Sequence, residues 1–188
     1  MRIGILLFND AEELDFVGPM EVFGVASRLK GGIDIVTLSK DGKPIHGRYG
    51  LRVQPDCSFA NSPDLDLLIV PGGKGAREQV RYDKESIAFA KTHAARARIA
   101  SVCTGALVLA EAGILDGKKA TTHWSALTIL RQYPKVHVVE GGRFVRDGNV
   151  ATSAGISAGI DLALEIVREL HVEQVASDVA REMEYRHD

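Results

Sequence analysis

The sequence predicts a three-layer α/β sandwich, in which helices cover both faces of a mostly parallel central sheet. Short, continuously apolar segments alternate along the chain with longer segments of helical pattern. Strands that are apolar on both faces are typical of parallel sheets covered by helices on each side. No internal repeat, low-complexity segment or linker divides the 188 residues. We therefore expect a single domain over residues 1–188.

Apolar runs bounded by turn residues mark the expected strands. These are Arg2–Phe8, Asp34–Ser39, Leu65–Val70, Ile99–Val102, Ala120–Thr122, Phe144–Arg146 and Asn149–Thr152. Asp147-Gly148 between the last two favours a tight hairpin. The segment 41–55 is rich in turn residues, and we expect a hairpin there with Leu51–Val53 on one arm.

The expected helices follow these strands. They are Phe16–Leu29, Asp83–Ala95, Thr104–Ala112, Ser125–Gln132, Ile156–Leu170 and Val172–Met183. Pro19 is placed in the first turn of its helix, where a missing N–H is tolerated. Gly31-Gly32 and Gly113 are typical helix ends. Ligands of such a fold bind where the carboxyl ends of the strands meet.

Composition excludes several classes of function. With 23 basic and 25 acidic residues the net charge is −2, so nucleic acid is not the expected partner. Aromatic residues are only 6%, too few to favour a stacking platform for single strands. No apolar run approaches the length of a membrane span, and the N-terminal run is too short for a signal peptide. We expect a cytoplasmic protein whose two cysteines, Cys57 and Cys103, are free thiols.

Cys103 is the candidate nucleophile. The segment 99–106 reads Ile-Ala-Ser-Val-Cys-Thr-Gly-Ala, so an apolar strand ends at a cysteine and a helix begins at once. Small residues two before and two after it, Ser101 and Gly105, match the frame of a nucleophile elbow. The helix N-terminus is expected to favour the reactive thiolate. A buried structural cysteine is the alternative. Cys57 is expected in a loop without this frame and is interpreted as a partly buried bystander.

A Pro-Gly-Gly turn follows the strand Leu65–Val70, at the same edge of the sheet as Cys103. Gly72 and Gly73 allow the backbone to approach a ligand closely. We expect the N–H groups of Gly73 and Thr104 to form a pair like that of an oxyanion hole. The alternative is a plain turn.

Asp15 is the candidate acid or base. Apolar neighbours surround it, and a carboxyl group in such a setting tends to hold its proton. A helix N-cap is an equally good interpretation of the same residue. Asp10, Glu12 and Glu13 are expected in a solvated loop, and His123 is interpreted as a packed scaffold residue. Because no histidine adjoins the candidate cysteine and no metal-ligand spacing appears, neither a Cys–His pair nor a metal site is expected.

These pieces together resemble the ThiJ/PfpI superfamily, with its flavodoxin-like, class I glutamine-amidotransferase-like fold. Within it the chain is similar to isocyanide hydratases and to the sensor domains of AraC-type transcription regulators. The resemblance spans nearly the whole chain. Its motifs are Gly-Ile-Leu-Leu-Phe at 4–8, Leu-Asp-Phe-Val-Gly-Pro at 14–19, Leu-Ile-Val-Pro-Gly-Gly at 68–73, Ser-Val-Cys-Thr-Gly-Ala at 101–106, Ala-Gly-Ile-Leu-Asp-Gly at 112–117, Ala-Thr-Thr-His-Trp at 120–124 and Thr-Ser-Ala-Gly-Ile-Ser-Ala-Gly-Ile-Asp at 152–161.

The resemblance implies roles for particular residues. Cys103 matches the nucleophile, Asp15 the acidic partner and Thr104 the residue that follows the nucleophile in the hydratases. Peptidase and amidotransferase branches carry a histidine at that last position or elsewhere as base, so those activities are disfavoured. The resemblance also implies that the substrate binds beside four backbone positions. These are Gly72, Gly73, Gly155 and Ile156.

The implied activity is hydration of an isocyanide to an N-substituted formamide, with no metal or organic cofactor. The implied assembly is a homodimer that binds a small-molecule substrate, with Glu21 as a surface or dimer residue. One alternative is a sensor of small molecules or of oxidation, which would lack a DNA-binding domain because the chain ends at Asp188. Another is a different cysteine hydrolase or a glyoxalase-like enzyme.

Overall fold

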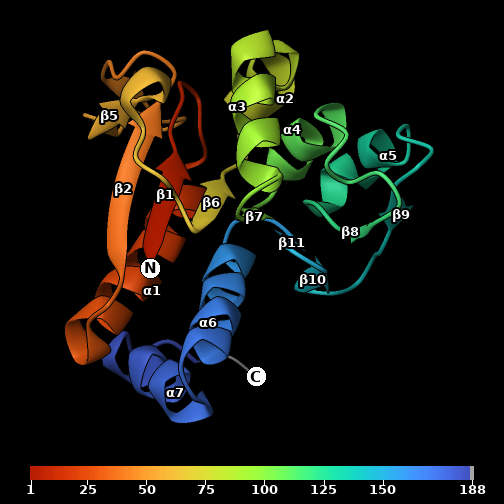
Figure 1. Cartoon of the computed structure of the whole chain (residues 1–188). Helices are drawn as coiled ribbons and strands as arrows, with labels where there is room; N and C mark the ends of the chain where they lie inside the picture. The colour runs from red at the N-terminus through yellow and green to blue at the C-terminus, as the bar shows by residue number, and fades with distance from the viewer. Residues whose placement is uncertain (187–188) are drawn as a thin grey trace.

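A computed structural model describes residues 1–186 and shows a seven-stranded sheet with the order β10-β11-β7-β6-β1-β2-β5 (Figure 1). Neighbouring strands are parallel except for the β10–β11 hairpin at one edge. The strands are β1 Arg2–Leu6, β2 Asp34–Ser39, β5 Cys57–Ser58, β6 Leu67–Val70, β7 Arg98–Ser101, β10 Phe144–Asp147 and β11 Val150–Ser153. The predicted α/β class is therefore confirmed.

Helices cover both faces of the sheet, as Figure 1 shows. On one face lie α1 Glu13–Lys30, α6 Ala158–Leu170 and α7 Glu173–Glu182. On the other lie α2 Lys74–Glu78, α3 Lys84–Ala94, α4 Gly105–Glu111 and α5 Leu127–Leu130. Two small two-stranded sheets pair β3 Ile45–His46 with β4 Arg52–Val53 and β8 Lys119–Ala120 with β9 His137–Val138. Short 3-10 turns occupy Phe59–Asn61, Val80–Tyr82 and Trp124–Ala126.

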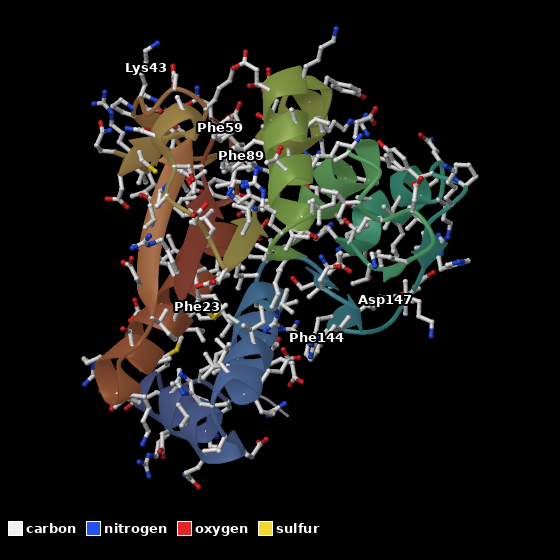
Figure 2. The ribbon with its side chains drawn as sticks, viewed as in Figure 1. Phe23, Lys43, Phe59, Phe89, Phe144 and Asp147 are labelled. Carbon is white, nitrogen blue, oxygen red and sulfur yellow. The ribbon has the colours of Figure 1, made fainter. Side chains whose placement is uncertain are left out.

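Two apolar cores explain the continuously apolar strands. In β6, Leu67 and Ile69 pack toward α1 and α6, whereas Leu68 and Val70 pack toward α4. Side chains alternate between the faces of a strand, so a strand covered on both faces must be apolar at every position. The second core also brings together the rings of Phe59 and Phe89, which stack 4.0 Å apart (Figure 2).

The N-terminal half differs from the prediction at two places. The first helix begins at Glu13, not at Phe16, so Pro19 lies inside the helix and not in its first turn. The early start is stabilised from outside the helix, because the Tyr49 N–H donates a 2.6 Å hydrogen bond to the Glu13 carboxylate. Cys57 lies in the edge strand β5, where it pairs with Leu38, and not in a loop. The strand at 34–39 and the hairpin within 41–55 are confirmed.

The C-terminal half contains shorter elements than the pattern predicts. Instead of one helix over 125–132, a 3-10 turn precedes the four-residue α5. The strand expected at 120–122 is shifted to 119–120 and belongs to the separate β8–β9 pair. The helix expected from Ile156 begins at Ala158, because Ile156 is left-handed with φ +57°. Within residues 1–186, no helix combines the length and the apolar character that a membrane crossing needs.

Candidate active site

Cys103 lies at the turn between β7 and α4, with the geometry of a nucleophile elbow. Its φ is +56°, which is uncommon for a residue with a side chain and is typical of strained functional turns. A Cβ atom on Gly105 would lie 2.1 Å from the Val70 carbonyl oxygen, so only glycine fits there. The Cys103 N–H donates to the Ala154 carbonyl at 3.1 Å. Only 6% of Cys103 is exposed, and both cysteines are free.

The Asp15 side chain lies beside the Cys103 thiol, although 88 positions separate the two residues. Asp15 is fully buried, and its Oδ2 accepts a 2.9 Å hydrogen bond from the Gly72 N–H. Its other oxygen, Oδ1, is buried without a hydrogen-bond partner at ordinary distance. The N-cap position of α1 is Glu12, so the N-cap interpretation of Asp15 is wrong. The structure therefore provides a buried thiol and a buried carboxyl in contact.

Burial dominates the titration of both groups. The pKa of Asp15 is raised to about 7, mainly by desolvation and also by the charge of Glu12, while the Gly72 N–H acts in the opposite direction. Desolvation likewise raises the pKa of Cys103 to about 12, and the charge of Asp15 acts in the same direction. The Thr104 N–H and hydroxyl lower the pKa of Cys103 without offsetting these effects.

The expectation that a helix N-terminus favours the thiolate is therefore wrong for the net pKa of Cys103, which is raised. The lowering effects come from Thr104, at the start of the seven-residue α4, and desolvation outweighs them. At neutral pH the thiol keeps its proton, while the neighbouring carboxyl is close to its midpoint. The pair can pass a proton between sulfur and carboxylate when an electrophile arrives.

The turn after β6 holds this pair in place. A Cβ on Gly72 would lie 2.5 Å from the Thr104 nitrogen and 2.9 Å from Asp15 Oδ2, so glycine is required for the close approach. The Gly73 N–H donates to Thr104 Oγ1 at 2.9 Å, and that hydroxyl donates to the Gly73 carbonyl at 3.1 Å. Because the Gly73 N–H is already engaged, it does not form the expected pair with the Thr104 N–H. The Thr104 N–H acts on the Cys103 sulfur.

The segment before α6 closes the other side of the site. The Ile156 N–H interacts with the Asp15 carboxyl and lowers its pKa. Gly155 lies under the His123 ring, since a Cβ there would be 2.0 Å from His123 Cδ2. His123 Nδ1 lies 2.8 Å from the Ser125 hydroxyl, which fits the packed, hydrogen-bonded residue predicted from sequence. In the described chain no three His, Cys, Asp or Glu side chains cluster as metal ligands would.

Glu12 is the neighbour of the site that sequence reasoning missed. It was expected in a solvated loop, yet it is 6% exposed and lies 3.4 Å from the Arg48 guanidinium. A reversal after β1 buries it: Asp10 has φ +59°, and the Glu12 N–H donates to the Gly72 carbonyl at 3.1 Å. The positive φ of a non-glycine residue has no sequence signal here beyond the tolerance of aspartate for that region.

Comparison with known proteins places this site in a family. The model of the DJ-1/PfpI family matches residues 1–169. The chain belongs to the DJ-1/PfpI family. This match confirms the resemblance to the ThiJ/PfpI superfamily that the sequence predicted, since ThiJ/PfpI and DJ-1/PfpI are two names for one group of proteins.

Members of the family similar to this chain differ in what they do. An isonitrile hydratase of Pseudomonas putida is 39% identical over 186 residues, which cover 98% of this chain and 78% of the relative. The transcriptional regulator GbdR of Pseudomonas aeruginosa is 31% identical over 182 residues, but this chain spans only 49% of its length. A THiJ/PfpI family protein of Pseudomonas syringae superposes with a TM-score of 0.91 at 37% identity, covering 100% of this chain and 76% of that one. DJ-1beta of Drosophila melanogaster superposes over 99% of this chain and 98% of its own, with a TM-score of 0.88 at 25% identity.

Proposed function

We propose that the protein hydrates an isocyanide to an N-substituted formamide, with Cys103 as nucleophile and Asp15 as acid and base. The observation that carries the proposal is the contact between a buried thiol and a buried carboxyl whose pKa is about 7. Thr104 follows the cysteine at a position where peptidase and amidotransferase branches can carry a histidine. Similarity to an isonitrile hydratase over 98% of the chain supports the choice of substrate class.

In the first half-reaction the Cys103 sulfur attacks the terminal carbon of R–N≡C. The thiol proton passes to the Asp15 carboxylate as the C–S bond forms, and Asp15 then delivers it to the same carbon. The product is a thioimidate, R–N=CH–S–Cys103, in which all atoms of substrate and thiol are retained. A carboxyl with a pKa near 7 serves both transfers, because it accepts and releases a proton at similar cost at neutral pH.

In the second half-reaction Asp15 is again ionised and takes a proton from water. The hydroxide adds to the thioimidate carbon and the nitrogen gains the proton, which gives R–NH–CH(OH)–S–Cys103. Collapse of this adduct forms the C=O bond and expels the sulfur, which recovers its proton. The net reaction is R–N≡C plus water to R–NH–CHO, and the enzyme returns to its first state.

The test is formamide production over many turnovers from an alkyl and an aryl isocyanide. Wild type is compared with Cys103→Ala, Asp15→Ala and the matched control Cys57→Ala. We expect no turnover from Cys103→Ala, a loss of about 100- to 10,000-fold from Asp15→Ala, and wild-type rates from Cys57→Ala. Background rates from all four proteins would refute the enzyme and favour the alternative below.

The alternative is a non-catalytic sensor that binds a small molecule in the same site. Similarity to GbdR over 95% of this chain favours it, since that relative is a regulator. A sensor would bind its ligand without consuming it, and binding would survive loss of the nucleophile. Isothermal titration of Cys103→Ala, run beside the turnover assay, separates the two functions.

We further propose that two copies of the chain form a homodimer through α1 and the β3–β4 hairpin. Apolar side chains on α1 face solvent, with Val17 at 37% and Met20 at 41% exposure. Tyr49 and Leu51 extend this apolar surface on the hairpin, which is joined to α1 through the Tyr49–Glu13 hydrogen bond. Contiguous exposed apolar side chains of this kind are typical of an interface.

A further inference from the structure

The turn between β11 and α6, residues 154–157, is held in a strained conformation. Ile156 has φ +57°, which is a genuine outlier for a β-branched residue. Such a conformation persists only where the surrounding structure stabilises it. Ser157 occupies the N-cap position of α6, yet its side chain caps no backbone N–H. The start of α6 therefore lacks the side-chain N-cap hydrogen bond that commonly stabilises the first turn of a helix.

Arg143, immediately before β10, binds the turn at both of its ends. Its carbonyl accepts a 2.8 Å hydrogen bond from the Ala154 N–H. Its guanidinium donates to Ser157 Oγ at 3.2 Å and, through Nε, to Asp161 Oδ2 at 2.7 Å in the first turn of α6. Asp161 is fixed in turn by the Tyr185 hydroxyl, which donates to its Oδ1 at 2.9 Å. Figure 2 shows the neighbouring residue Phe144 beside α6.

The same turn touches both members of the reactive pair. The Ala154 carbonyl accepts the Cys103 N–H, and the Ile156 N–H interacts with the Asp15 carboxyl. A displacement of residues 154–157 would therefore change the surroundings of the thiol and of the carboxyl together. Arg143 itself lies outside the site and reaches it only through this turn.

We propose that Arg143 is a positioning residue, which clamps residues 154–157 so that the Ile156 N–H stays against Asp15 and the Ala154 carbonyl against Cys103. Through Ser157 and Asp161 the Arg143 guanidinium fixes the first turn of α6, and it offsets the cost of the left-handed Ile156. The inference rests on the proposed function only where turnover is measured, because the reactivity of Cys103 reports on the clamp directly.

Asp15 faces few other groups that titrate or carry charge. Glu12 approaches it from the chain before α1, with Arg48 of the hairpin behind Glu12, and the Cys103 thiol approaches it from the elbow. The β6–α2 turn presents the uncharged Gly72 N–H. Since the Ile156 N–H lowers the pKa of Asp15, its loss is expected to raise that pKa.

The chain offers a matched control for Arg143. Arg146 lies three residues further along the same hairpin and forms an ion pair with Glu169, near the other end of α6. The side chains of Arg143 and Arg146 are similarly exposed, at 54% and 48%. Removal of either deletes one link between β10 and α6, but only Arg143 contacts the turn at 154–157.

The experiment measures the rate of Cys103 alkylation by iodoacetamide against pH, with mass spectrometry to follow this cysteine alone. Wild type, Arg143→Ala and Arg146→Ala are compared, together with their melting temperatures. In wild type the rate should rise near pH 7, as Asp15 becomes able to accept the thiol proton. For Arg143→Ala we expect this rise about half a pH unit or more higher, since the Ile156 N–H, which favours the ionised carboxyl, would move away from Asp15. Arg146→Ala should follow the wild-type profile.

Two further variants keep the test decisive if Arg143→Ala folds poorly. Ser157→Ala removes one acceptor of the guanidinium and should shift the profile in the same direction by less. Arg143→Lys keeps the charge near Asp161 and should return part of the shift. Coincident profiles for Arg143→Ala and Arg146→Ala, or no shift in Ser157→Ala when Arg143→Ala cannot be studied, would overturn the clamp.

Turnover separates this inference from the proposed function. If wild type hydrates isocyanides, Arg143→Ala should lose about tenfold or more in kcat with little change in KM, because the pair and not substrate binding is disturbed. A shifted alkylation profile without turnover in wild type would refute the hydratase and retain the clamp. Turnover in wild type, together with no shift of the alkylation profile in Arg143→Ala, would retain the hydratase and refute the clamp.

Discussion

The substitution Asp15→Asn tests the burial of Asp15 through the stability of the fold. Asparagine has nearly the same shape, and its amide oxygen can still accept the Gly72 N–H that now donates to Oδ2 at 2.9 Å. What changes is the charge. Desolvation raises the pKa of Asp15 from 3.8 to about 7, so the folded state holds this proton more tightly than the unfolded chain does. The neutral form is stable in the fold, whereas the ionised form is costly.

The sign and size of the effect follow from this shift. Its contribution to stability is fully present below the unfolded pKa of 3.8 and is lost as pH rises through the folded pKa of about 7. Within that window, each rise of one pH unit lowers the free energy of unfolding of wild type by about 1.4 kcal/mol. The variant does not lose this stability, because asparagine does not titrate. Between pH 5 and pH 8 the free energy of unfolding of Asp15→Asn should therefore gain about 2 to 3 kcal/mol relative to wild type.

Urea denaturation of both proteins at pH 5, 6, 7 and 8 measures this difference. Asp41→Asn is the control, because the Lys43 ammonium lowers the pKa of Asp41 at the surface, and this carboxyl is ionised in both the folded and the unfolded state above pH 5. Any difference in stability between that variant and wild type should therefore be small and constant from pH 5 to pH 8. A difference between Asp15→Asn and wild type that is constant with pH would refute the argument, since it would mean that Asp15 is not desolvated in the fold.

The remaining predictions concern the glycine turn, the reactive thiol and the dimer. Gly72→Ala should lower turnover by tenfold or more and lower the melting temperature, since its Cβ would lie 2.5 Å from a backbone nitrogen. Gly24→Ala, with open space around it, should instead raise the free energy of unfolding by about 0.5–1 kcal/mol. Activity assays and thermal melts compare the two variants. Wild type mixed with an aryl isocyanide and quenched with acid should carry a mass adduct on Cys103 and none on Cys57 by peptide mapping, and the converse labelling would contradict the assignment of the nucleophile. Val17→Asp should convert a homodimer to a monomer by size-exclusion chromatography with light scattering, because a charge would be buried at the interface, and an unchanged mass would place the interface elsewhere.

Local sequence features determined the fold class and the elbow at Cys103. Continuous apolar runs such as Leu65–Val70 predicted strands buried on both faces, and the frame of small residues around Cys103 predicted an elbow. Both follow from short-range geometry: the alternation of side chains along a strand, and the lack of space at a strand-to-helix turn. The three residues that follow β6, Pro-Gly-Gly, also indicated a close backbone approach, which the structure shows at Gly72.

The tertiary structure alone decided the electrostatics of the site. From sequence, Asp15 fitted an N-cap as well as a buried acid, and Glu12 was expected in solvent; a chain reversal at Asp10 and the contact with Gly72 bury both. The pKa of Cys103 is raised and not lowered, because desolvation and a neighbouring charge outweigh the hydrogen bonds from Thr104. Burial and the distance between charges depend on groups brought together from separate strands, and no spacing along the chain encodes them.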